Sequence, residues 1–191
     1  QETALETSQK RVMTVSVVNL TNFDWMAEHI PPEKLVDFLN DYLTAMTEPI
    51  ANHSGIIDNF VGDRVIGFWG PPFCGEKSHA GHACLAALEQ VARFNALKTK
   101  YADLIGDHGL DIRVGIATGE VVVGSIGTDK SRSYTVVGDC VNYANRLEKA
   151  NRIYGTQILA SHETASMAAG EIEMRDLVYQ FEEKICGLTA Q

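Results

Sequence analysis

Hydrophobic and polar positions change their spacing along the chain in a way that separates strands from helices. An apolar, β-branched run at 12–18 predicts a buried strand, because strands covered on both faces lack polar alternation. After Pro31-Pro32, apolar residues recur at helical spacing as far as Ser54-Gly55, which predicts one long amphipathic helix. The first quarter of the chain therefore predicts a strand followed by a helix.

The next segments predict a hairpin and then a second helix. Two apolar runs at 56–61 and 65–69 flank Gly62-Asp63-Arg64, the spacing of a tight β-hairpin. Apolar residues at helical spacing then predict a helix over 79–103. The remaining predicted elements are strands at 110–117 and 120–126 with a hairpin at Thr118-Gly119, a helix at 139–153, a strand at 157–160, a short helix from Ser161, and a strand region near 172–181.

The first six elements follow the order β-α-β-β-α-β. This order predicts an α+β fold with a ferredoxin-like core, in which a mainly antiparallel sheet carries its helices on one face. A right-handed crossover makes the first two strands parallel and places the third between them. Asn19, at the end of the first strand, should then lie beside Asp63 at the tip of the first hairpin.

Composition and charge narrow the classes of function. The chain has 191 residues and a formal net charge of -9, which suits one globular domain and argues against a nucleic-acid-binding surface. No apolar run approaches the roughly 18 to 20 residues that span a bilayer. Because the chain does not start with Met, we expect a domain cut from a longer protein, with 1–10 as a linker end and 11–191 as the domain.

Cysteine and histidine patterns add little chemistry. The four cysteines form no C-x-x-C pair, so reduced thiols are expected rather than a disulfide framework. His79 and His82 have helical spacing but no evident third ligand, which favours structural histidines over a zinc site. On spacing alone, Asp63 is best interpreted as a turn residue, since its neighbour Asn19 is not acidic.

Four motifs change that interpretation. In order, they resemble the successive motifs of a class III adenylate/guanylate cyclase catalytic domain over about residues 11–160, and the last two are long and specific. They are Val15-Ser16-Val17-Val18-Asn19-Leu20-Thr21-Asn22-Phe23, Asp58-Asn59-Phe60-Val61-Gly62-Asp63, the run from Gly115 to Gly127, and the run from Tyr134 to Glu148.

The resemblance implies a cytoplasmic domain of a larger signalling protein, membrane-anchored or multidomain. It also implies a dimer whose active site is shared between two protomers. One protomer supplies two aspartates that hold two Mg²⁺ (or Mn²⁺) ions, and its partner supplies purine-selecting residues and an Asn/Arg pair. Asp63 resembles the second metal aspartate, and Asn142 and Arg146 resemble the pair that steadies the transition state. The simpler alternatives are that Asn142 is a polar residue on a helix surface and that Arg146 forms a surface salt bridge. Their spacing of four, however, places both on one helix face, which fits a shared target.

The first metal position departs from the family pattern. Asn19 aligns with the first metal aspartate, and an amide oxygen carries no charge and cannot bridge two ions. We expect this loss to cost about 3–5 kcal/mol of transition-state stabilisation, or about 10²–10⁴ in rate. Asp24 stands where the family usually has Thr or Ser, in the loop expected to cradle phosphates. Its charge should repel a triphosphate unless it turns outward or replaces the missing carboxylate.

The substrate-binding positions of the resemblance are Phe23, Asn59 and Thr135. Adenylate cyclases usually have Lys at position 59 and Asp or Thr at 135, whereas guanylate cyclases favour Glu and a small residue. Thr135 therefore favours adenine, while Asn59 both donates and accepts and decides nothing. Near the C-terminus, the segment around Lys184 only loosely resembles the family's basic phosphate-contacting segment, and an exposed lysine without a role is the simpler interpretation.

These observations predict an adenylate cyclase domain that makes cyclic AMP and pyrophosphate from ATP as a homodimer, with guanylate cyclase activity not excluded. Retention of Asp63, Thr135, Asn142 and Arg146 motivates that hypothesis. Asn19 and Asp24 motivate the alternative, a catalytically degenerate module for dimerisation or nucleotide sensing. A heterodimer partner that lends its Asn142/Arg146 half to another cyclase chain, and an engineered substitution at Asn19, remain further hypotheses.

Overall fold

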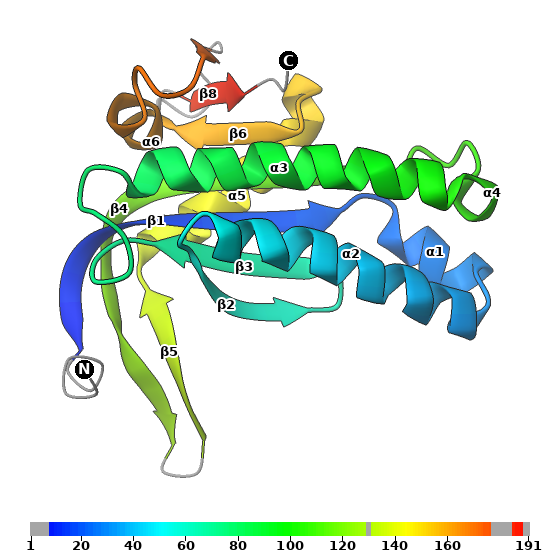
Figure 1. The fold of residues 1–191 in the computed structure, drawn as a ribbon, viewed down its shortest axis with the longest axis horizontal. Helices are drawn as coiled ribbons and strands as arrows, with labels where there is room; N and C mark the ends of the chain where they lie inside the picture. Colours follow the sequence, from blue (N-terminus) through cyan, green and yellow to red (C-terminus); the bar gives the residue numbers. More distant parts are fainter. Residues whose placement is uncertain (1–7, 129–130, 177–184, 189–191) are drawn as a thin grey trace.

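One mainly antiparallel sheet organises the chain. The computed structural model describes residues 8–128, 131–176 and 185–188, and within them eight strands form a sheet of order β2-β3-β1-β4-β6-β8-β7, with β5 paired to β4 (Figure 1). The elements are β1 (Gln9–Leu20), α1 (Phe23–His29), α2 (Pro32–Asn52), β2 (Ile56–Val61), β3 (Arg64–Trp69), α3 (His79–Lys100), α4 (Ala102–Ile105), β4 (Ile112–Thr128), β5 (Ser131–Val137), α5 (Asp139–Tyr154), β6 (Ile158–Ser161), α6 (His162–Met167), β7 (Met174–Asp176) and β8 (Ile185–Leu188).

The predicted βαββαβ core is confirmed. β3 lies between β1 and β2 and is antiparallel to both, so β1 and β2 run parallel. This arrangement brings the end of β1 to the tip of the β2–β3 hairpin, where the Leu20 amide donates a hydrogen bond of 3.0 Å to Asp63 Oδ2. The crossover argument therefore placed Asn19 and Asp63 at the correct corner of the sheet.

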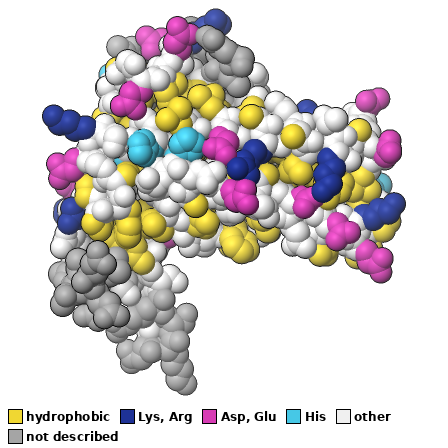
Figure 2. Space-filling model, in the orientation of Figure 1, with side chains coloured by type: hydrophobic (Ala, Val, Ile, Leu, Met, Phe, Trp, Pro, Cys, Tyr) yellow, Lys and Arg dark blue, Asp and Glu magenta, His cyan; other side chains and the backbone are white. Residues whose placement is uncertain are grey.

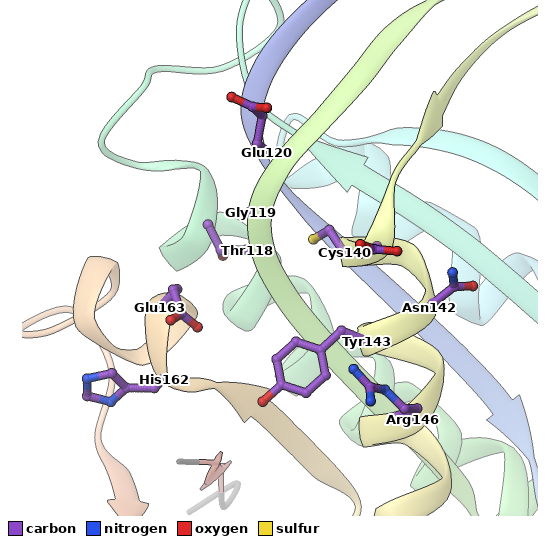
Figure 3. A pocket seen from close by; sticks show the side chains of 10 residues that line it. Thr118, Gly119, Glu120, Cys140, Asn142, Tyr143, Arg146, His162 and Glu163 are labelled. Carbon is purple, nitrogen blue, oxygen red and sulfur yellow. The ribbon is translucent and has the colours of Figure 1, made fainter. Parts of the chain in front are cut away.

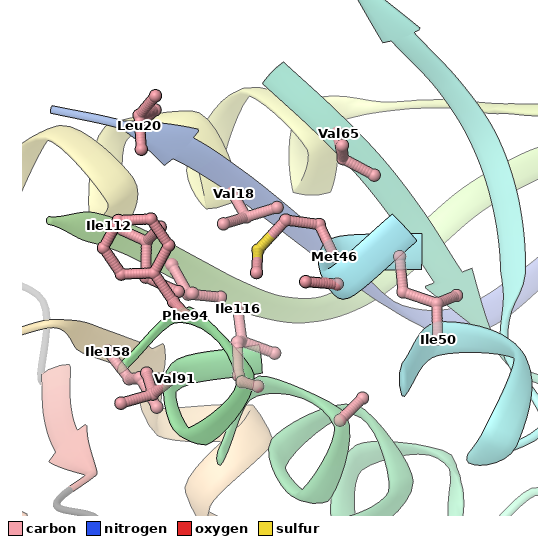
Figure 4. Close-up of a cluster of buried hydrophobic side chains, with 14 of the residues drawn as sticks. Val18, Leu20, Met46, Ile50, Val65, Val91, Phe94, Ile112, Ile116 and Ile158 are labelled. Atoms are coloured by element: carbon pink, nitrogen blue, oxygen red, sulfur yellow. The ribbon is translucent and has the colours of Figure 1, made fainter. Parts of the chain in front are cut away.

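Helices cover both faces of the sheet, not one. α2 and α3 pack on one face over a large apolar cluster, to which Val18, Met46 and Phe94 contribute (Figures 1 and 4). α5 packs on the opposite face over a second cluster that includes Val15 and Leu147. The expectation of one covered face holds for the helices within the βαββαβ core. It fails for α5, which follows that core and whose apolar side buries the other face.

The predicted hairpin at Thr118-Gly119 is wrong. β4 continues through these residues, because Thr118 pairs with Thr14 and Gly119 with Met13 along the whole length of β1. β4 instead runs on to Thr128, and β5, which begins at Ser131, returns antiparallel along the second half of β4. The resulting two-stranded arm extends away from the body of the domain (Figure 1). A Thr-Gly pair signals a turn locally, but here the sheet partner β1 overrides it.

Other differences concern short elements and boundaries. α1 was not predicted, because seven residues are too few to show helical periodicity. β1 begins at Gln9, two residues inside the range expected as a linker end. The predicted helix over 79–103 is divided into α3 and α4. Of the predicted strand region near 172–181, the structure describes residues up to 176 and has the strand β7 at Met174–Asp176. Lys184 lies outside the described residues.

Charged side chains of both signs are interspersed on the face formed by α2 and α3 (Figure 2). Arg93 of α3 pairs with Glu89 at 2.9 Å and also with Glu48 of α2, and Lys100 lies 2.6 Å from Asp41 of α2. These pairs at the surface each contribute little stability, because water reaches and screens them. The two helices are held together mainly by the apolar cluster beneath them.

α5 lies so close to β4 at Gly115 that no side chain would fit at this position. A Cβ atom at Gly115 would overlap the Ala144 carbonyl oxygen and the Glu148 amide nitrogen of α5. Asn151, which is 1% exposed, donates from Nδ2 to the Val114 carbonyl oxygen at 2.9 Å. The missing side chain and the buried amide therefore fix the height and the rotation of α5 on the sheet.

We predict that Gly115→Ala lowers the free energy of unfolding by about 3 kcal/mol, because its methyl group meets backbone atoms that no rotamer change can move. Gly119→Ala is the matched control on the same strand, where a Cβ would lie 3.7 Å from Cys140 Cβ, in ordinary contact. Its effect should be about 0.5 kcal/mol or less. Urea unfolding of both variants measures the difference, and equal losses would contradict the close contact.

Candidate active site

The first half of the candidate site is a polar pocket at the end of β1. Its wall combines the β1 end, the loop into α1, the β2–β3 hairpin tip and the C-terminal half of α5. Three residues predicted from the sequence, Asn19, Phe23 and Asp63, line this pocket together. The complete lining is Asn19, Leu20, Thr21, Asn22, Phe23, Asp24, Asp63, Arg113, Glu148 and Arg152.

Asp63 is held in place from two sides. Its Oδ2 accepts the Leu20 amide at 3.0 Å, and its carbonyl oxygen accepts the hydroxyl of Tyr42, a fully buried residue of α2, at 2.8 Å. Partial burial raises the pKa of Asp63, the Leu20 hydrogen bond opposes that rise, and the nearby charge of Asp24 adds to it. Tyr42 is one of the apolar positions at helical spacing in the predicted helix, and that spacing gives no sign of its contact with the hairpin tip.

Asn19 is oriented by a carboxyl group that sequence analysis left without a role. Its Nδ2 donates to Glu148 Oε2 at 3.1 Å, and Glu148 is 4% exposed. Burial raises the pKa of Glu148, while the Asn19 hydrogen bond and the charge of Arg113 lower it. Because the amide nitrogen is engaged, the carbonyl oxygen of Asn19 is the atom left to bind a cation.

The pocket carries charges of both signs. Asp24 lines it, and its negative charge raises the pKa of Asp63. Arg113 at the start of β4 and Arg152 near the end of α5 supply two cations, which suit phosphate oxygens. Sequence analysis missed both arginines. Arg152 lies one helical turn after Glu148, so helical spacing from the last motif could have identified it.

The oxygen atoms of this pocket fit a hard divalent cation. Asp63 offers a carboxylate and Asn19 an amide oxygen, the types of donor that Mg²⁺ prefers. Among the described residues, no group of three or more His, Cys, Asp or Glu side chains is placed to hold a metal ion. An ion bound here would therefore take its remaining ligands from water, substrate phosphates or the backbone. A second, bridged ion has no bridging carboxylate at position 19.

Asn142 and Arg146 line a different pocket. This second pocket lies between the N-terminal half of α5, the middle of β4 and the start of α6, and both residues are exposed. Figure 3 shows Tyr143 and Arg146 projecting from α5 into it, with His162 and Glu163 of α6 across from them. The Arg146 guanidinium lies 5.2 Å from the centre of the Tyr143 ring, a contact that restricts an otherwise mobile cation.

Asn59 and Thr135 are brought together by a neighbour. Thr135 of β5 donates its hydroxyl hydrogen to Asp58 Oδ1, and Asn59 Nδ2 donates to Asp58 Oδ2 at 3.0 Å. β2 and β5 are far apart in sheet order, so this contact depends on the path of β5. The family resemblance alone predicted Asn59 and Thr135 as purine-selecting positions, and the sequence assigned no role to Asp58.

The two histidines at the start of α3 have separate partners. His79 is 1% exposed and its Nδ1 lies 2.7 Å from Thr14 Oγ1, inside a buried chain of hydroxyls that continues to Thr118 and Thr164. Burial lowers the pKa of His79. His82 instead meets the His53 carbonyl oxygen at 3.0 Å. These contacts give His79 a structural role that joins α3 to β1.

Comparisons with known proteins agree with this architecture. The family model described as the adenylate and guanylate cyclase catalytic domain matches residues 5–184. Adenylate cyclase 1 of Rhizobium meliloti is 34% identical over 168 residues, which is 88% of this chain and 25% of that protein. Adenylate cyclase of Anabaena cylindrica is 31% identical over 149 residues, 78% of this chain and 29% of that protein. The chain thus spans little more than a quarter of these relatives.

Solved structures give the same result for the fold. The adenylyl cyclase CyaB of P. aeruginosa superposes with a TM-score of 0.85 at 32% identity, covering 96% of both chains. The guanylyl cyclase Cya2 superposes with a TM-score of 0.80 at 29% identity, covering 95% of this chain and 92% of its own. In the described part of the present chain, no helix has the length and apolarity to cross a membrane. The family model that matches residues 5–184 and the relative at 34% identity show that this chain belongs to the family of class III adenylate and guanylate cyclase catalytic domains.

Proposed function

We propose that this domain converts ATP to 3′,5′-cyclic AMP and pyrophosphate as a homodimer. One observation carries the proposal: Asn19 and Asp63 line one pocket, while Asn142 and Arg146 line another on the same chain. A single chain therefore separates the residues that the reaction needs together. Two copies related by a twofold axis could each face one pocket with the partner's other pocket, which would complete two equivalent sites.

In the proposed metal-binding half, this chain supplies oxygen ligands and positive charge. Asp63 and the Asn19 carbonyl oxygen would hold Mg²⁺ or Mn²⁺, the ions that this family generally uses. A bound ion would favour ionisation of the ribose 3′-hydroxyl and neutralise phosphate charge. Arg113 and Arg152 would bind phosphate oxygens, and Tyr42 and Leu20 would keep Asp63 at the hairpin tip.

In the other half, α5 presents Asn142 and Arg146 to the same nucleotide. The reaction joins the ribose 3′-oxygen to the α-phosphorus and breaks the α–β bridging bond, so that pyrophosphate leaves with the negative charge that develops. A guanidinium held against the Tyr143 ring can stabilise that charge with little reorganisation. Asn142 would hydrogen-bond the ribose, and Asn59 and Thr135 would contact the purine.

A second candidate function is a regulatory module that binds nucleotide without turnover. Asn19 favours it, because the hydrogen bond from its Nδ2 to Glu148 stabilises a neutral amide where a bridging carboxylate belongs. The same observation is compatible with a heterodimer in which this chain contributes only its Asn142/Arg146 half. Activity measurements separate these functions from the homodimeric enzyme.

We predict that Asn19→Asp raises the rate of cyclic AMP formation by about 10²–10⁴, because it restores a carboxylate able to bridge two ions. The rates of the purified domain and its variant should be measured with ATP or GTP, first with Mn²⁺ and then with Mg²⁺. Asp24→Asn serves as the control for a charge change in the same pocket, and it should not reproduce the gain. Equal rates for the domain and the Asn19→Asp variant would show that position 19 does not limit turnover.

We predict that two inactive variants complement each other when mixed. In the Asn19→Asp background, Asp63→Ala removes the metal half and Arg146→Ala removes the other half, so each variant alone should lose at least about 10²-fold in rate. Random pairing gives hybrid dimers with one intact site, and about a quarter of the parent activity should return. No recovery after subunit exchange, checked with differently tagged chains, would contradict the shared site.

We predict that Glu148→Met weakens Mn²⁺ binding about tenfold, because the Asn19 amide loses the acceptor that orients its oxygen. Lys149→Met, an exposed neighbour on α5, is the matched control and should leave binding unchanged. In the Asn19→Asp background the loss should be smaller, since a carboxylate presents an oxygen in either orientation and needs no acceptor to orient it. Electron paramagnetic resonance of free Mn²⁺ measures binding, and thermal unfolding tests whether each variant is folded.

A further inference from the structure

Three polar side chains meet where β5 passes β2. Asp58 accepts the hydroxyl hydrogen of Thr135 on one carboxylate oxygen and an amide hydrogen of Asn59 on the other, at 3.0 Å for the second contact. Asp58 and Thr135 are half-buried, and Asn59 is exposed. One carboxyl group therefore touches both positions that are proposed to contact the purine.

These contacts fix the hydrogen-bonding character of Thr135. A hydroxyl group has one hydrogen to donate, and a carboxylate can only accept. Because Thr135 donates to Asp58, its oxygen has only lone pairs left for a ligand. Asn59 differs, since one of its two amide hydrogens and its carbonyl oxygen remain available after the contact with Asp58.

The two purines present opposite groups to such a pair. Adenine carries an exocyclic amine that donates and a ring N1 that accepts, whereas guanine carries an O6 that accepts and an N1–H that donates. A Thr135 oxygen that can only accept a hydrogen bond matches the adenine amine, which donates one. It does not match guanine O6, which also only accepts. Asn59 can serve either base with its remaining hydrogen or its oxygen. The discrimination therefore falls on Thr135, and through it on Asp58.

We propose that Asp58 is a specificity-determining positioning residue, which holds Thr135 as a hydrogen-bond acceptor and thereby favours adenine over guanine nucleotides. This inference rests on the proposed function, because it takes Asn59 and Thr135 as the purine-contacting residues. It goes beyond that function by naming the group that sets the polarity of Thr135. Asp58 itself need not touch the base.

The test compares the binding of 3′-deoxy-ATP and 3′-deoxy-GTP, which lack the hydroxyl group needed for cyclisation, to the purified homodimer with Mn²⁺. The measured quantity is the ratio of the two dissociation constants, GTP analogue over ATP analogue. Asp58→Asn keeps the shape but lets position 58 donate to Thr135, which frees the Thr135 hydroxyl hydrogen for guanine O6. We expect the ratio to fall about tenfold, with the larger change in binding of the GTP analogue.

Two further variants separate this role from a general effect of charge or folding. Thr135→Val removes the hydroxyl group, and in that background Asp58→Asn should change the ratio by less than about twofold. Asp103→Asn on α4 removes one negative charge elsewhere and should shift both affinities equally. Thermal unfolding of each variant shows whether the contact between β2 and β5 is needed for folding.

The outcomes distinguish failure of the role of Asp58 from failure of the proposed function. The role of Asp58 is overturned if Asp58→Asn leaves the ratio unchanged. It is also overturned if Asp58→Asn changes the ratio by the same factor whether position 135 is Thr or Val. Neither outcome affects nucleotide binding itself. Failure of the parent domain and of its Asn19→Asp variant to bind either analogue overturns the proposed function, and the role of Asp58 with it. A fall in the ratio that depends on Thr135 supports both.

Discussion

The close packing of α5 against β4 at Gly115 is the constraint on which the rest of the structure depends. Backbone atoms of Ala144 and Glu148 occupy the space that a side chain at position 115 would need, and the buried amide of Asn151 adds a hydrogen bond to the neighbouring carbonyl of Val114. Such contact leaves α5 no freedom to slide or rotate, because displacement would cost both the packing and a buried hydrogen bond. The side chains of α5 that line the two pockets take their positions from this contact.

That rigid helix serves two pockets at once. Its C-terminal half places Glu148 and Arg152 beside Asn19 and Asp63, and its N-terminal half places Asn142 and Arg146 in the second pocket. Arg146 and Glu148 are two residues apart and therefore point about 200° from each other around the helix axis, so the two sets of residues line different pockets. This geometry of α5 gives a physical reason why two protomers would share one site. The distance between the two halves on each chain is then set by a single helix.

Two carboxyl groups in this domain act through the neutral side chains that they hold. Glu148 accepts the amide hydrogen of Asn19 and so leaves an oxygen for a cation, while Asp58 accepts the hydroxyl hydrogen of Thr135 and so leaves lone pairs for a base. In both pairs the carboxylate, which can only accept, determines which atom of its partner remains available. Asn19 is thus a neutral side chain with a defined orientation.

The sequence by itself determined the order of the core elements, the parallel crossover and the corner where Asn19 meets Asp63. These features follow from local hydrophobic periodicity, from turn residues and from the handedness of connections, all of which act over short stretches of chain. It also identified the family, since the long motifs are specific. Tertiary structure alone decided that β4 passes straight through Thr118-Gly119, that α5 covers the second face, and that Glu148 and Asp58 hold Asn19 and Thr135. Glu148 lies 129 positions from Asn19 along the chain, and Thr135 lies 77 positions from Asp58. No local pattern in the sequence encodes the partner of a side chain at such a separation.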